Sequence, residues 1–271
     1  MPQILSYLLC SALYAVVAVV LARAMSRPDW NAPLGRGALH LATALPLALH
    51  TALLYGSVFA DGHMYLGVGT SVSVIIWLTV LIYWAGSFFQ RLEGLQVFIN
   101  AAAALLVWAT LLLPSVRPLS HTDLPAFRAH LLISLLAYSL FTIASLQALM
   151  MAMLEKRLHG GRVPSYLQSL PPLLTMERLL FRIIAMGFVL LTLTLVSGMF
   201  FSEMLVGQPL KFNHKVVFGI LSWFIYAALL AGRRIYGWRG RLALRWTLAG
   251  FLALLLAYVG SKFVVEIILH R

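Results

Sequence analysis

The stretch LLFRIIAMGFVLLTLTLVSGMFF (Leu179–Phe201) decides the fold class of this sequence. It carries one charge, Arg182, and it is longer than the about 20 mostly apolar residues that a membrane-spanning helix needs. Seven further runs of this kind lie before and after it: Ile4–Leu21, Leu39–Phe59, Leu66–Trp84, Leu95–Leu113, Phe127–Leu149, His214–Leu230 and Trp246–Leu269. The sequence therefore predicts an all-α, polytopic integral membrane protein with eight transmembrane helices.

The composition excludes a water-soluble protein. Of the 271 residues, 62% are hydrophobic and 10% are charged, whereas soluble domains carry roughly 25% charged residues. Eight spans leave no room for a soluble catalytic module, and no HExxH, GxSxG, Walker A or GxGxxG motif occurs. We expect a single membrane-embedded domain over residues 1–271 that is not an enzyme.

The basic residues predict the orientation of the chain in the membrane. Arginines and lysines concentrate in the cytoplasmic loops of membrane proteins. Counted over alternate loops, fourteen lie on one side and six on the other, the six being Arg117, Arg128, Lys211, Lys215, Lys262 and Arg271. This predicts that both termini lie outside. It also explains the net charge of +12 without a nucleic-acid partner.

Eight histidines stand out against so few charges. His40 and His159 map to the cytoplasmic side and His50 to the interior of the second span, while the remaining five fall near the outer face: His63, His121, His130, His214 and His270. Imidazole is a ligand for haem iron, copper and zinc, so outer histidines from several helices could converge on a metal or on haem. Composition alone does not choose among these ligands.

Each candidate histidine has a structural alternative. His50 lies roughly 13 Å below the outer end of its span, where an ionisable group is a functional candidate, but it could instead hydrogen-bond a Ser or Thr of a neighbouring helix. His130 and His214 open the fifth and seventh spans, where interfacial residues that cap a helix also occur. His270 stands next to the last residue, where a chain can fray.

Several segments resemble a known family. They are HLLISLLAYSLF (His130–Phe141), Glu177–Phe201 and Phe212–Leu269. The chain is similar to the CcsA/CcmC-type cytochrome c assembly proteins, and most similar to the YpjD branch of bacterial inner-membrane proteins. This resemblance implies a multi-pass protein of the bacterial inner membrane that binds haem b in the helix bundle and presents it at the periplasmic face, for attachment to apocytochrome c.

The resemblance also implies roles for particular residues. His130 resembles the outer histidine that precedes the haem loop of this family, and His50 resembles the histidine of an early span. His270 approximates the second outer histidine. Lys215 and Trp223 keep the spacing of the family's lysine and tryptophan after the haem loop.

Two departures from the family pattern are visible. The segment SEMLVGQPLKFNHK, where a tryptophan-rich haem loop is expected, contains neither Trp nor Asp. Ala231 stands where a second buried histidine is expected. His214, which the family pattern does not require, could replace a lost ligand.

The expectation is therefore a haem-handling protein. His130 and His214 would ligate the iron at the outer face, with His270 as an alternative partner and His50 as a deeper relay. Lys215, and with it Arg128 and Lys262, would pair with the haem propionates. Its partners would be the bilayer, haem, and apocytochrome c or other assembly proteins. One rival is a haem-free accessory subunit of a transport or metal-homeostasis complex; a second is a small-solute transporter with a path along His50, Asn100 and Gln147.

Overall fold

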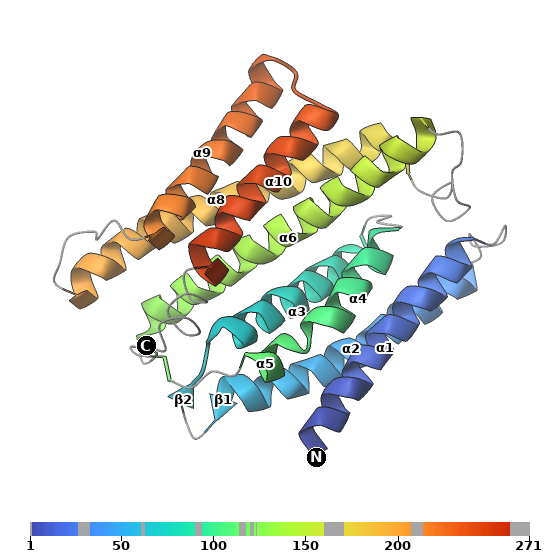
Figure 1. Ribbon diagram of the computed structural model, residues 1–271, viewed down its shortest axis with the longest axis horizontal. Coiled ribbons are helices and arrows are strands. Elements are labelled where there is room, and N and C mark those ends of the chain that lie inside the picture. Colours follow the sequence, from blue (N-terminus) through green and yellow to red (C-terminus); the bar gives the residue numbers. More distant parts are fainter. Residues whose placement is uncertain are drawn as a thin grey trace. The chain divides into compact units, whose positions relative to one another are not determined.

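The computed structural model describes residues 2–26, 33–60, 63–89, 94–113, 118–119, 122, 124–159, 171–206 and 214–260, and Figure 1 shows their course. Nearly all of them are helical. The elements are α1 (Pro2–Met25), α2 (Pro33–Val58), β1 (Phe59–Ala60), β2 (His63–Met64), α3 (Val68–Gly86), α4 (Leu95–Leu106), α5 (Ala109–Leu112), α6 (Pro125–His159), α8 (Leu173–Val206), α9 (His214–Ile235), α10 (Arg241–Leu255) and the π-helical turn η1 (Leu256–Gly260). The two short strands pair in antiparallel fashion, Phe59 opposite Met64 and Ala60 opposite His63.

The prediction of eight membrane spans is confirmed. Eight segments of the described chain are long and apolar enough to cross a membrane: Gln3–Met25, His40–Val58, Val68–Gly86, Leu95–Leu112, Pro125–Arg157, Leu173–Phe200, His214–Ile235 and Arg241–Tyr258. The orientation of the termini stays a prediction.

The last span begins earlier than its apolar run suggested. The predicted run opens at Trp246, but α10 begins at Arg241, directly after Gly240, whose φ of 61° is rarely adopted by other residues. The helix includes Arg241 and Arg245 because both side chains are exposed at its first turns. Long arginines at a helix end keep their charge in water while the stem covers apolar surface. The predicted end at Leu269 lies outside the described residues.

The chain divides into two compact units, each described here by itself. Unit 1 comprises residues 1–118 and 149–173, with helices α1 to α5; unit 2 comprises residues 119–148 and 174–271, with most of α6 and with α8, α9 and α10. The single domain over residues 1–271 stays a prediction.

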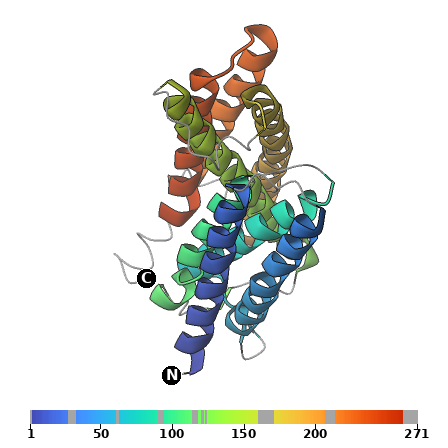
Figure 2. The same ribbon diagram turned by 90° about the vertical axis from the view of Figure 1, so that its right-hand side faces the viewer.

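In unit 1, α1 packs on α2 and α4, and α3 packs on α2, α4 and α5 (Figures 1 and 2). The buried residues of α1 recur every three or four positions: Tyr7, Cys10, Tyr14, Val17, Ala18, Leu21 and Met25. The opposite face exposes aliphatic side chains such as Leu5 and Val16. A helix that is apolar on both faces and exposes one of them is typical of a membrane span, whose outer face meets lipid.

In unit 2, three glycines let aromatic rings pack closely. The rings of Phe141 and Tyr226 stack with centroids 4.0 Å apart. Gly187 faces the Phe141 ring and Gly250 faces the Tyr226 ring, at distances where an added Cβ would lie 2.8–3.3 Å from ring carbons. At Gly232 an added Cβ would collide with the indole of Trp238. These contacts hold α6, α8, α9 and α10 together around an aromatic core.

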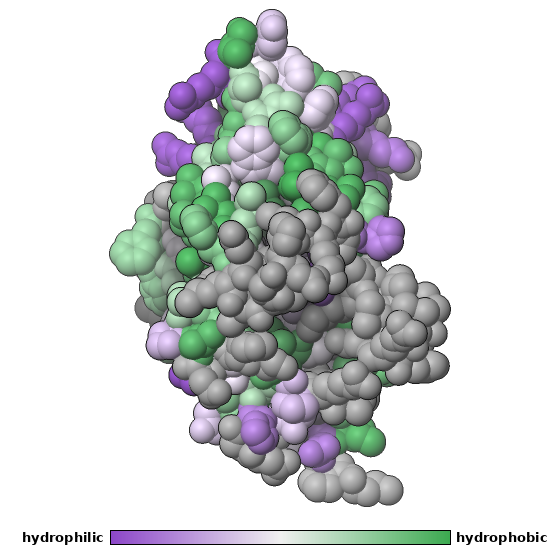
Figure 3. Space-filling view, turned by 90° about the vertical axis from the view of Figure 1, so that its left-hand side faces the viewer, coloured by the Kyte–Doolittle hydropathy of each residue, from purple (hydrophilic) through white to green (hydrophobic). Residues whose placement is uncertain are grey.

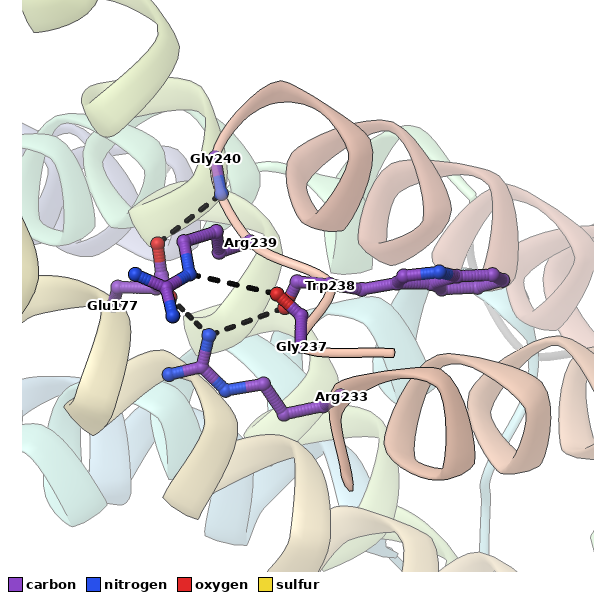
Figure 4. Close-up of polar contacts among 6 residues, drawn as sticks. All are labelled: Glu177, Arg233, Gly237, Trp238, Arg239 and Gly240. Carbon is purple, nitrogen blue, oxygen red and sulfur yellow. Dashed lines mark hydrogen bonds and ion pairs between the residues drawn. The ribbon is translucent and has the colours of Figure 1, made fainter. Parts of the chain in front are cut away.

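A polar cluster joins the start of α8 to the connection between α9 and α10 (Figure 4). The buried Glu177 carboxylate accepts a bond from Arg233 Nη1 at 2.6 Å through Oε1, and from the Gly240 N–H at 3.1 Å through Oε2. Arg233 Nη1 also donates to the Trp238 carbonyl at 3.1 Å, and its guanidinium lies 4.6 Å from the centroid of the Phe181 ring. We call Glu177, Arg233 and Gly240 the clasp. Figure 3 shows hydrophilic side chains on both sides of the upper end, where α9 meets α10, with apolar side chains between and directly below them.

The clasp fixes the antiparallel register of α8 and α9. Further along, Trp223 Nε1 donates to Thr192 Oγ1 at 2.9 Å, and an added Cβ at Gly219 would lie 3.4 Å from Leu195. Two residues beyond Leu195 in α8, and two before Gly219 in α9, the same register places Ser197 level with Val217. The two helices therefore bring the end of α8 and the start of α9 to the same end of unit 2.

Removal of the clasp carboxylate tests its contribution to stability. Glu177→Ala leaves Arg233, which is 30% exposed, without its ion-pair partner, and should lower the free energy of unfolding by about 1–3 kcal/mol. Thermal unfolding in mild detergent measures the change. The control is Arg239→Gln, because exposed Arg239 contacts only the Gly237 carbonyl, at 3.5 Å, within this cluster. Equal unfolding temperatures for Glu177→Ala and wild type would contradict the assignment.

Candidate functional site

The predicted site residues fall into both units of the structure. His50 belongs to unit 1, whereas His130, His214 and Lys215 belong to unit 2. Six of the predicted outer residues lie outside the described part of the chain: Arg117, His121, Lys211, Lys262, His270 and Arg271. The exposed His63 lies on the short strand β2.

His50 of α2 is fully buried between two hydroxyl groups. Its Nε2 lies 2.9 Å from Ser73 Oγ of α3, and its Nδ1 lies 3.3 Å from Tyr14 Oη of α1. The Tyr14 ring meets the imidazole edge-on, with centroids 5.8 Å apart. One residue thus ties three helices of unit 1 together through both of its ring nitrogens.

This arrangement is the structural alternative raised for His50, a buried imidazole bonded to a serine of a neighbouring helix. A polar group at this depth must find protein partners because lipid offers none. To ligate iron, the ring would first have to leave one of its two hydroxyl partners. The role of His50 as a relay ligand stays a prediction.

His130 stands in the second turn of α6, with its imidazole held against α8. Its Nδ1 lies 2.7 Å from Ser197 Oγ. The Ser197 hydroxyl has a backbone acceptor of its own, the Leu193 carbonyl at 2.6 Å. With the hydroxyl proton on that carbonyl, the Ser197 oxygen accepts from Nδ1, and a neutral imidazole, which carries one N–H, then has its lone pair on Nε2. Nε2 is then the ring atom suited to bind a metal.

The surroundings of His130 orient its ring further. Gly198, next to Ser197, would place an added Cβ 3.5 Å from the His130 Cε1 atom, so α8 approaches the imidazole at van der Waals distance. The Phe127 ring stacks on the imidazole, with ring centroids 6.4 Å apart and an interplanar angle of 22°. His130 is half-buried. A ring held by a serine, a glycine backbone and an aromatic face has few rotamers left, which is the kind of outer support that metal-binding histidines use.

His214 and Lys215 begin α9 and are both exposed. The register of α8 and α9 places Ser197, and with it His130, level with Val217. His214 therefore lies about 5 Å further along the helix axis, toward the same end of unit 2. The structure brings His130, His214 and Lys215 to one end of this unit. Arg128, at the start of α6, donates through Nε to the Thr122 carbonyl.

The described residues contain no group of three or more His, Cys, Asp and Glu side chains that could hold a metal ion. A closed zinc site, which needs about four such ligands, does not fit the described part of unit 2. Haem iron needs only one or two axial ligands from the protein, because the porphyrin supplies the rest.

Sequence reasoning missed the partners that orient the two histidines. Ser197 is 67 residues from His130, and Tyr14 and Ser73 are 36 and 23 residues from His50. Serine and tyrosine are common in apolar spans, and the sequence carries no signal for the rotation of one helix against another. Only the packed structure pairs them.

A structural role for His50 has a measurable consequence. His50→Ala leaves the Tyr14 and Ser73 hydroxyls without their imidazole and opens a cavity, so the free energy of unfolding should fall by about 2–4 kcal/mol. The measurement is thermal unfolding in detergent of protein prepared without added haem. His40→Ala is the control, because His40 is only half-buried and lies against Ser87 and Phe88 at a helix end. Unchanged unfolding of His50→Ala would contradict the structural role.

Comparison with known proteins places the chain in a family. The family model described as cytochrome c assembly protein matches residues 38–269. The inner membrane protein YpjD of Escherichia coli (strain K12) is 33% identical over 235 residues, covering 84% of this chain and 86% of the relative. A 28.8 kDa protein of Azospirillum brasilense is 27% identical over 215 residues, covering 77% and 78%.

More distant similarity reaches a protein with a named role. The cytochrome c biogenesis protein CcsA of Gloeobacter violaceus is 29% identical over 92 residues, covering 34% of this chain and 27% of the relative. The resemblance predicted from the sequence is therefore confirmed, and the match extends over most of the eight-span bundle. The chain belongs to the cytochrome c assembly protein family, as a multi-pass inner-membrane protein.

Proposed function

We propose that this protein handles haem b in cytochrome c assembly, without being an enzyme, and presents it at the predicted periplasmic end of unit 2. The observation that carries the proposal is the hydrogen bond between His130 Nδ1 and Ser197 Oγ, since it leaves the lone pair of the ring on Nε2. Membership of the cytochrome c assembly family and the partial similarity to CcsA support the same role.

His130 is the proposed first axial ligand. Ser197 and Gly198 hold its ring against α8, so ligation through Nε2 needs no new orientation of the imidazole. His214 is the proposed second ligand because it opens α9 at the same end of unit 2; His270 is the alternative. Bound haem would supply the iron centre and the vinyl groups to which an apocytochrome c is joined.

Cations at this end would pair with the haem propionates. Lys215 follows His214 directly and is exposed, and Arg128 stands two residues before His130. Ionised donors form the stronger hydrogen bonds to carboxylates, so these residues would set which edge of the porphyrin faces water. His50 has no part in this proposal: its two hydroxyl partners support a structural role in unit 1.

A second candidate function is a haem-free accessory subunit of a membrane transport or metal-homeostasis complex. One observation favours it: the segment Glu203–Lys215 contains no Trp and no Asp, so the stacking of tryptophans on a porphyrin would be missing there. The small-solute transporter has less support. The Asn100 and Gln147 amides donate to backbone carbonyls within their own units, at 2.8 Å each, and so act as internal polar partners.

Absorption spectra distinguish the two candidates. Protein purified in mild detergent from haem-supplied cells should show a Soret band. His130→Ala should lose most of this band, and His214→Ala should shift it, because one axial ligand changes. Ser197→Ala should weaken haem binding by about three- to tenfold in a titration, since the Nδ1 proton loses its acceptor.

The control is His63→Ala, which removes an exposed histidine of unit 1. It should retain the wild-type spectrum. Size-exclusion profiles and circular dichroism show whether each variant is folded. A colourless wild type under these conditions, or a folded His130→Ala with an unchanged Soret band, would contradict the haem proposal; the colourless wild type would favour the accessory subunit.

A further inference from the structure

The clasp end of unit 2 carries positive charge that the haem proposal does not use. Besides Arg233 of the clasp, six exposed arginines lie there: Arg178, Arg182, Arg234, Arg239, Arg241 and Arg245. We call these six the arginine patch. Among the side chains that the structure describes in unit 2, the only carboxylate is that of Glu177, which is buried and bonded to Arg233. The surface at this end therefore has a large excess of positive charge.

The clasp gathers the patch from three segments of the chain. Each clasp residue has an arginine next to it in the sequence: Arg178 after Glu177, Arg234 after Arg233, and Arg239 and Arg241 on either side of Gly240. The Glu177 carboxylate bonds to the Arg233 guanidinium and to the Gly240 N–H, and so holds the three segments together (Figure 4). Because consecutive Cα atoms are only about 3.8 Å apart, four exposed arginines surround one buried carboxylate.

On α8, two arginines of the patch stand at the head of an apolar stripe. The exposed residues of this helix follow one another at intervals of three or four: Arg178, Arg182, Met186, Val189, Leu193 and Val196. Residues at these intervals lie on one face of a helix. All of them belong to the apolar span Leu173–Phe200. The exposed face of this span thus carries two cations at one end and apolar side chains along the rest.

The last span repeats the pattern. Its exposed residues include Arg241, Arg245, Ala249, Leu252 and Leu256, again at intervals of three or four and again with the two arginines first. A guanidinium near the end of a span reaches the head-group level of the bilayer, while its stem covers apolar surface. The indoles of Trp238 and Trp246 lie at the same end, 5.2 Å apart, and tryptophans concentrate at the membrane–water interface.

This layout matches a phospholipid with a net negative charge. Two arginines four residues apart are separated by about 6 Å along the helix axis, so both can bond to one phosphate, whose geometry suits the guanidinium fork. The apolar stripe continues from them as an acyl chain continues from its head group. A zwitterionic lipid would add a cation of its own to this end. A soluble acidic partner would have to reach arginines that belong to the spans themselves, where the lipid phosphate already lies.

We propose that the arginine patch binds anionic phospholipid. The pair Arg178 and Arg182 holds one lipid and the pair Arg241 and Arg245 holds another, each with its acyl chains along the stripe of its own helix. Bound phosphate would offset the repulsion among the arginines that the clasp holds together. The site is independent of haem, because His130 and His214 lie at the other end of unit 2.

Native mass spectrometry of the delipidated, detergent-solubilised protein tests the proposal. The protein is titrated with phosphatidylglycerol and, separately, with phosphatidylcholine of the same acyl chains. We expect two saturable sites for phosphatidylglycerol and at least tenfold weaker binding of phosphatidylcholine. Replacing both arginines of one pair, Arg178→Gln with Arg182→Gln, should remove one of the two lipids. Each arginine near the surface strengthens binding by about fivefold, so the lost site should be weakened about 25-fold.

The matched control is Lys156→Gln with Arg157→Gln in unit 1. It removes the same charge from exposed residues near the end of a span, but neighbouring positions do not share a helix face and form no such pair. It should keep both lipids. Unfolding temperatures establish that each variant is folded.

Four results would overturn the proposal. They are equal affinities for the two lipids, two retained phosphatidylglycerol molecules in the folded Arg178→Gln, Arg182→Gln protein, an equal loss of lipid in the control, and binding of polyglutamate to the patch in preference to phosphatidylglycerol. The last result would assign the patch to an acidic protein partner. None of these outcomes bears on the Soret band, so the haem proposal stands or fails separately.

Discussion

The constraint on which this structure depends is that lipid cannot solvate a polar group. Every donor or acceptor within a span must pair inside the protein, or it must lie at a helix end. His50 follows the first course, with a hydroxyl at each ring nitrogen, and so do the indoles of Trp77 and Trp223, which donate to Thr51 and Thr192 at 2.9 Å. Apolar side chains, in contrast, gain little from being buried, because lipid accepts them as readily as the protein interior does, and they contribute through close packing, as Phe141 and Tyr226 do.

The same constraint gives the two ends of unit 2 different chemistry. One end carries a buried carboxylate that binds an arginine and a backbone N–H, and this clasp sets the register of α8 and α9. The other end carries His130, oriented by Ser197, and His214 at the start of α9. The clasp therefore affects the candidate site through the helix register, because the register determines which residues of α9 stand level with Ser197. Full pairing has exceptions among the described residues: the Asn100 Oδ1, Thr110 Oγ1 and Ser145 Oγ atoms are buried without a hydrogen-bond partner.

Span number and family followed from the sequence because both depend on features that are local in the chain. Apolar runs of sufficient length identified all eight spans found in the described chain, and the segments around His130 and after Glu177 carried the resemblance that the family match confirms. Contacts that depend on how one helix is rotated against another could not be predicted from the sequence. Nothing local pairs Glu177 with Arg233, 56 residues later, or leaves Thr110 without the carbonyl partner that Thr79 has. The early start of α10 escaped prediction because Arg241 and Arg245 read as loop residues, although their stems can lie along the first turns of a helix.

The account requires that the histidine end of unit 2 faces outward and the clasp end faces the cytoplasm. Single cysteines at the exposed positions Leu124, before α6, and Arg239, between α9 and α10, test this directly, because the native Cys10 is fully buried. The measurement is labelling of spheroplasts with a membrane-impermeant maleimide. The account predicts that Leu124→Cys is labelled on intact spheroplasts and Arg239→Cys only after the membrane is disrupted. The reverse pattern would place His130 and His214 in the cytoplasm and contradict presentation of haem at the periplasmic face.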